Sequence, residues 1–144
     1  MNYSNQKKTA SNLHADLAYS VELFGEFIIL DASEVPKFIR NQALMRRCNV
    51  GFMALFTYLC EITGLPEEEQ TNMDPEEIAE YFIKKGVLDG EDEVLFLRLT
   101  AINMASRVCH IDAASEEKTI ELCAEPLYQL LKKVVDSTRC EHAL

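Results

Sequence analysis

The side chains best suited to chemistry lie in one short stretch of the chain, "TAINMASRVCHID". Four polar residues in it step by three, four and three, which places them on one stripe of a helix: Thr100, Asn103, Arg107 and His110. Ser106 lies beside the stripe, one turn before His110. The pattern leaves three interpretations open: a reactive centre, a polar groove that faces a partner or a second copy, and a polar face turned to water.

No known catalytic motif strengthens the first interpretation. The sequence has no GxSxG, no glycine-rich phosphate loop, no HExxH and no evident Cys–His–Asp arrangement. The two other histidines, His14 and His142, lie near the ends of the chain and are predicted to be solvated. We therefore predict no catalytic residue and no cofactor.

The cysteine pattern indicates free thiols. Five cysteines are an odd number and form no CxxC pair: Cys48, Cys60, Cys109, Cys123 and Cys140. Structural zinc sites use closely spaced ligand pairs. Cys48 and Cys60 fall in apolar helical stretches, where a thiol behaves as a small hydrophobe. We expect reduced cysteines in a reducing compartment, with neither a metal nor disulfides.

The charge distribution limits the classes of partner. The net charge of −10 argues against general nucleic-acid binding, which needs clustered Lys and Arg. One local exception is "FIRNQALMRRCN", with Arg40, Arg46 and Arg47. Acidic residues concentrate in residues 67–93, and such a run is typical of solvated helix ends and loops or of a surface that attracts a basic partner.

Length and hydropathy predict one domain outside the membrane. The chain has 144 residues, 48% of them hydrophobic and 26% charged, as in an ordinary globular domain. No apolar run approaches the roughly 20 residues that cross a bilayer, and the N-terminus has no continuous apolar segment of a secretory signal. We expect a single domain over residues 1–144, with frayed ends at about 1–8 and 138–144, in the cytoplasm.

Helical periodicity extends along the whole chain. It predicts helices at about 9–30, 34–63, 75–85, 92–109 and 115–137, with a loop in "LPEEEQTNM". The helix starts and stops are marked by Ser33, Gly64, the "DPEE" capping box and Ser115, and Pro126 should kink or divide the last helix. No period-two alternation predicts a sheet. The predicted fold is all-α: an antiparallel up-and-down four-helix bundle with one extra short helix.

The predicted helix over 34–63 is apolar on more than one side in its second half, with "FMALFTYL". Such a helix must bury apolar surface twice, against its own domain and against something else. This pattern predicts a homodimer.

A family resemblance rests on the order of these features over residues 38–136. "RNQALMRRCNVGFMALFTYLCEITG" gives a long helix with an Arg-rich start. "DPEEIAEYFIKKG" follows as a capped helix that ends in Gly, and then come an acidic turn, an apolar helix that closes on His110, and "DAASEEKTIELCAEPLYQLL". The chain resembles the nucleotidyltransferase substrate-binding family within the HEPN group of helical bundles. The resemblance implies a homodimeric four-helix bundle, often associated with a minimal nucleotidyltransferase in toxin–antitoxin-like modules.

The sequence departs from the family at its active positions. In the family, RNA-cleaving members carry Arg, four to six residues, then His, and transferase-linked members carry Tyr two positions after that His. Here His110 matches the histidine, but Ala105 and Ser106 stand where the family has Arg-Asn, and Asp112 stands at the Tyr position. Residues five apart are offset by about 140° and residues three apart by about 60° in the opposite sense, so Arg107 does not replace the missing arginine.

These departures favour a binding protein over a nuclease. We predict a non-catalytic helical binding protein of this type, whose candidate binding residues are Thr100, Asn103, Ser106, Arg107, His110 and Asp112. One alternative is an RNase toxin that uses Arg107 and His110. The other is an acidic protein–protein adaptor without a nucleotide role.

Overall fold

The computed structural model describes residues 9–29, 36–108 and 112–138 of the chain, and every element in them is helical. The helices are α1 (Ala10–Ile29), α2 (Lys37–Thr63), α3 (Glu67–Gln70), α4 (Pro75–Lys84), the 3-10 helix η3 (Gly90–Asp92), α5 (Glu93–Val108) and α6 (Ala113–Thr138). No strand occurs in these ranges, which confirms the all-α class. Within the same ranges, no helix combines the length and the apolar character that crossing a bilayer requires.

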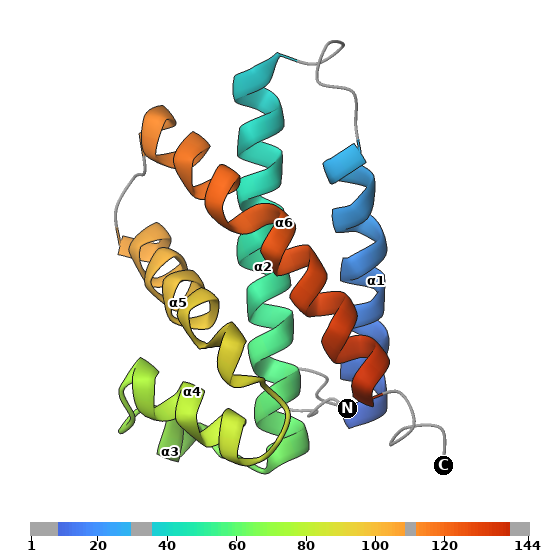
Figure 1. Ribbon diagram of the computed structural model, residues 1–144, viewed down its shortest axis with the longest axis vertical. Helices are drawn as coiled ribbons and strands as arrows, with labels where there is room; N and C mark the ends of the chain where they lie inside the picture. The colour runs from blue at the N-terminus through green and yellow to red at the C-terminus, as the bar shows by residue number, and fades with distance from the viewer. Residues whose placement is uncertain (1–8, 30–35, 109–111, 139–144) are drawn as a thin grey trace, which may run out of the picture.

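Three long helices, α1, α2 and α6, pack side by side and enclose the main core (Figure 1). Each contributes side chains that are at most 1% exposed: Leu17, Phe24, Leu55, Leu59, Leu127 and Leu131. The three helices approach closely at Gly51, where an added Cβ would lie 3.2 Å from Leu131 and 3.7 Å from Phe24. Because apolar residues recur at helical spacing on all three helices, their packing follows from the sequence pattern.

An aromatic cluster holds α4 and α5 against the other side of α2. Phe96 of α5 is fully buried, with its ring centroid 5.4 Å from Phe52 and 5.8 Å from Phe82 of α4. The ring centroid of Phe56 lies 6.0 Å from that of Phe82 and 6.4 Å from that of Phe96. Most of the wide apolar face of α2 is therefore covered by the chain's own helices, and it does not by itself require a second copy.

The predicted stop of α2 and the predicted cap of α4 are confirmed, whereas Ser33, predicted to mark the start of α2, lies outside the described residues and α2 begins at Lys37, after Pro36. α2 ends at Gly64 with φ of 72°, a left-handed conformation that suits glycine, and the Leu65 amide donates to Cys60 O. α4 begins with a capping box, in which the Asp74 amide donates to Glu77 Oε1 at 3.1 Å.

Two expectations about local structure are wrong. The stretch predicted as a loop contains α3, since Pro66 precedes three glutamates that favour the positive end of a helix. Of the two effects expected of Pro126, division of the last helix is wrong, because α6 continues through it, and a kink at this position stays a prediction. The proline ring is on the exposed side, while Cys123, Leu127 and Leu130 on the other side are buried. Their packing outweighs the hydrogen bond that proline cannot donate.

Candidate functional site

The polar stripe predicted from the sequence lies on α5, and Phe96 sets the orientation of that helix. Because Phe96 packs against Phe52 of α2 and Phe82 of α4, and Leu99 is buried as well, the residues one turn later on the same side also face inward. Asn103 is one of them and is only 8% exposed. Its side-chain amide donates to Asn49 Oδ1 of α2 across 3.4 Å. The middle of the stripe is thus turned toward α2, and not toward water.

The hydroxyls of Thr100, in the stripe, and of Ser106, beside it, are bonded within α5. Thr100 Oγ1 donates to Phe96 O at 2.9 Å, and Ser106 Oγ donates to Ile102 O at 2.9 Å. Ser and Thr commonly return such bonds to the carbonyl one turn earlier in a helix. Both side chains are partly buried. Within the described part of the chain, neither hydroxyl is paired with a general base.

Asp112 caps the N-terminus of α6. Its Oδ1 accepts a hydrogen bond from the Ser115 amide at 2.8 Å, and its carbonyl accepts the first helical bond, from Glu116. The helix therefore begins at Ala113 with Asp112 as its cap, and the expectation that Ser115 opens it is wrong. A carboxylate is a strong N-cap because it pairs with helix amides and with the positive end of the dipole.

The basic members of the stripe are placed less fully. Arg107 belongs to α5, but its side chain lies outside the described part of the structure. His110 lies outside the described residues altogether. The structure therefore brings together Thr100, Asn103 and Ser106 on one helix, with Asp112 at the start of the next.

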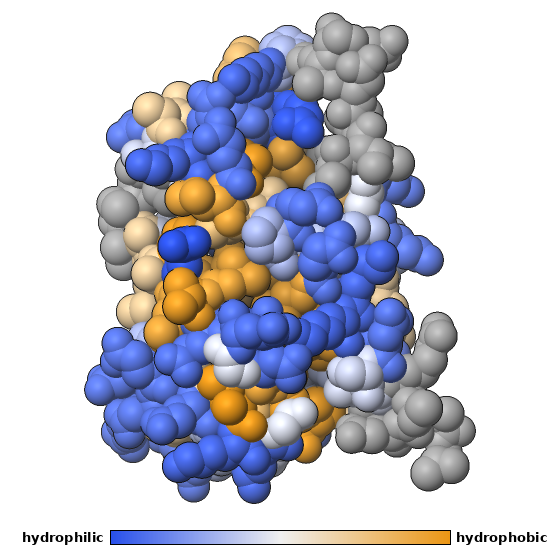
Figure 2. All heavy atoms as spheres, viewed as in Figure 1, coloured by the Kyte–Doolittle hydropathy of each residue, from blue (hydrophilic) through white to orange (hydrophobic). Residues whose placement is uncertain are grey.

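Sequence reasoning missed the apolar surface on the same two helices. Val94 and Met104 of α5 are 64% and 58% exposed, and Leu122 of α6 is 46% exposed. Figure 2 shows hydrophobic surface along the side of the molecule formed by α5 and α6. Helical spacing shows which residues share a face, but it does not show which face the neighbouring helices leave open.

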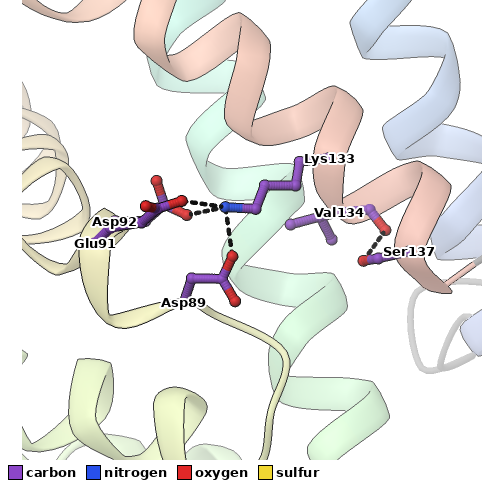
Figure 3. A network of polar contacts seen from close by, with 6 residues as sticks. All are labelled: Asp89, Glu91, Asp92, Lys133, Val134 and Ser137. Carbon is purple, nitrogen blue, oxygen red and sulfur yellow. Dashed lines mark hydrogen bonds and ion pairs between the residues drawn. The ribbon is translucent and has the colours of Figure 1, made fainter.

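An ion-pair cluster holds the segment that connects α4 with α5 against α6 (Figure 3). Lys133 Nζ lies 2.5 Å from Asp89, 2.8 Å from Asp92 and 3.2 Å from Glu91. The hydrogen bonds to Asp89 and Asp92 raise the pKa of Lys133 well above its usual value. The three carboxylates are close enough to share a metal ion, but here the ammonium group lies among them. No short-range spacing could have predicted a contact between residues about 40 positions apart.

Another polar cluster joins α1, α2 and α6. His14, which we expected to be solvated, is half-buried, and its Nε2 donates to Val135 O at 3.0 Å. The buried Tyr58 hydroxyl donates to Thr138 Oγ1 at 2.7 Å, and Thr138 donates in turn to Val134 O. These contacts give His14 a structural role.

The described thiols are poor nucleophiles. Cys48, Cys60 and Cys123 are free and buried, as expected for the first two. Burial raises the pKa of both Cys48 and Cys60 to about 12, so almost no thiolate forms near neutral pH. Burial also raises the pKa of Cys123, although the positive charge of Arg98 acts in the opposite direction.

Comparisons of the chain with protein-family models, with curated proteins and with solved structures find no match.

Proposed function

We propose that the chain is a non-catalytic helical binding protein of the nucleotidyltransferase substrate-binding, HEPN-like type. In this proposal α1, α2, α5 and α6 form an antiparallel up-and-down four-helix bundle. The protein works in the cytoplasm as a homodimer, with a minimal nucleotidyltransferase, or both.

The observation that carries the proposal is the engagement of the described stripe residues within the fold. The hydroxyls of Thr100 and Ser106 bond to their own helix, Asn103 contacts α2, and Asp112 caps α6. A nuclease centre needs groups that are aimed at a substrate, with a cation at the phosphate and a proton carrier beside it. The described side chains instead make contacts within the fold. This arrangement supports a structural role for them in a protein that binds its partner through another surface.

The surface proposed for association is the exposed apolar set of α5 and α6: Val94, Met104 and Leu122. When a partner covers exposed apolar side chains, the free energy of association gains about 25 cal/mol for each Å² of apolar area buried. A genuine interface buries about 1,000 Å² or more in total. These residues lie on the exposed sides of α5 and α6, whereas the described residues of the polar stripe are bonded within the fold.

The first test is the oligomeric state of the full chain, measured by light scattering at micromolar concentration. We expect a dimer for the wild type and a monomer for the double variant Met104→Glu, Leu122→Glu. The matched control is the pair Tyr19→Glu with Val50→Glu, which introduces the same two negative charges at apolar residues of α1 and α2 that are 61% and 49% exposed. A monomeric wild type, or equal effects of both variants, contradicts the proposed homodimer.

The second test separates a binding protein from a nuclease. Wild type and His110→Ala are incubated with structured and with single-stranded RNA, and both are co-purified with a minimal nucleotidyltransferase from the same genome. We expect only background cleavage by both proteins, and weaker association of the variant. Robust cleavage that disappears in His110→Ala would overturn the proposal in favour of the RNase toxin.

A further inference from the structure

A groove runs along the C-terminal half of α2, on a surface that does not include the α5 stripe. One wall is a stripe of α2 from Met53 to Gly64, and the other is the segment from Leu65 to Gln70, which contains α3. The groove has a volume of about 840 Å³. Its α2 wall covers eleven helical steps, or about 16 Å, which is three turns.

The floor of the groove is apolar and its rim is acidic. Met53 and Phe56, which are three residues apart on α2, provide the partly exposed apolar surface of the floor, and the buried Cys60 and Leu65 complete it beneath them. Glu61, Glu67 and Glu68 line the rim, and the described lining residues include no lysine or arginine. An apolar strip with one sign of charge along its edges selects a partner with the complementary pattern.

The α3 wall is held in place by the fold. Leu65 is 5% exposed and anchors the start of the segment, and Gln70 Nε2 donates to Leu65 O at 3.3 Å. At the end of α2, the Tyr81 hydroxyl of α4 donates to Thr63 O at 2.8 Å. A groove whose walls are fixed before binding avoids part of the ordering cost of association.

We infer that this groove binds a basic amphipathic helix of a partner protein. A helix of three or more turns places apolar residues at i, i+3 or i+4 and i+7 against the α2 stripe. Its flanking Lys and Arg side chains then meet Glu61, Glu67 and Glu68. Nucleic acid and anionic membranes are repelled by the same rim, and two copies of this chain that met groove to groove would oppose like charges.

The experiment titrates the full chain into three fluorescein-labelled synthetic peptides of equal length, with fluorescence anisotropy as the readout. The first has leucines at helical spacing with lysines on the other face. The second replaces every lysine by glutamate, and the third replaces every leucine by serine. We expect saturable binding of the first peptide only, with a Kd of about 10–100 μM.

Charge reversal locates the binding. Glu67→Lys with Glu68→Lys raises the net charge by four, from −10 to −6, and so does the control pair Glu76→Lys with Glu80→Lys on the exposed side of α4. We expect the first pair to weaken binding about tenfold or more and the control pair to change it less than about twofold. Thr57→Trp, at an exposed lining position, should also weaken binding, because the indole fills the groove.

Three results would overturn the inference. They are no saturable binding of the leucine–lysine peptide, equal binding of the serine–lysine peptide, and equal effects of the two charge-reversal pairs. Either of the last two results would mean that the net charge of the protein attracts the peptide and that the groove does not bind it. None of these variants lies on α5 or α6, so failure here is distinct from failure of the proposed α5–α6 interface.

Discussion

Replacing Asn103 by alanine tests whether the polar stripe faces α2. The hydrogen bond to Asn49 spans 3.4 Å, longer than the common range for N–H···O, so its net contribution falls in the lower half of the usual range, about 0.5–1 kcal/mol. Truncation also removes the packing of a side chain that is only 8% exposed and leaves Asn49 Oδ1 without this donor. We expect Asn103→Ala to lower the free energy of unfolding by about 1–2 kcal/mol.

A double-mutant cycle isolates the contact from the packing. Wild type, Asn49→Ala, Asn103→Ala and the double variant are unfolded in urea, at two protein concentrations so that any effect of association on stability is separated. We expect a coupling free energy of about 0.5–1 kcal/mol between the two asparagines. The control is Thr100→Val, which removes a hydroxyl that donates to Phe96 O of its own helix and should change stability by less than about 0.5 kcal/mol.

Two results together would contradict the inward orientation of Asn103. If the coupling is close to zero and Asn103→Ala weakens self-association without lowering stability, the amide acts at an interface with another molecule. The middle of the stripe would then face a partner, and the orientation of α5 given by Phe96 would be wrong.

Four further predictions concern the body of the fold. Pro126→Ala should stabilise the protein by about 1–3 kcal/mol in urea unfolding, because proline costs about 3 kcal/mol in a helix interior; Pro75→Ala, at the first turn of α4 where proline is tolerated, should give no comparable gain. Tyr58→Phe should lower the free energy of unfolding by about 0.5–1.5 kcal/mol through loss of one buried hydrogen bond, and an unchanged value would contradict that contact. Cys48 and Cys60 should be alkylated slowly in the native protein at neutral pH, and rapid labelling without unfolding would disprove their burial. Because their folded pKa values of about 12 lie above the ordinary 9.0, the stability that they provide is complete below pH 9 and is lost as pH rises toward 12. The fall in stability over that window should be smaller in Cys48→Ala than in the wild type.

Features governed by nearest neighbours were predictable from the sequence. The capping box at Asp74 and Glu77 depends on a spacing of three residues, and the end of α2 depends on a glycine that accepts a positive φ. Both involve atoms within one turn of chain, so the sequence pattern already contains their geometry.

Features that depend on packing between distant segments were not predictable. Pro126 breaks a helix by local rules, but the buried residues on both sides of it keep α6 continuous. Lys133 meets three carboxylates that lie more than one helix away along the chain. In both cases the deciding neighbours come from other parts of the chain and are brought together by tertiary packing.

The exposed fractions of neighbouring residues on α5 show which features of the candidate site could be predicted from the sequence. Periodicity correctly groups Asn103 with other polar residues, but hydropathy would bury Met104 and expose its neighbour. The structure does the opposite: Asn103 is 8% exposed and Met104 is 58% exposed. The reason is the position of Phe96, which lies seven residues before Asn103 and therefore on nearly the same face of the helix. Burying that ring among Phe52, Phe56 and Phe82 carries the amide inward and leaves the methionine outside. An exposed methionine beside a buried amide costs stability in an isolated chain. That cost is offset when a partner covers α5, which is why we place the binding surface on the apolar side of this helix rather than on the polar stripe alone.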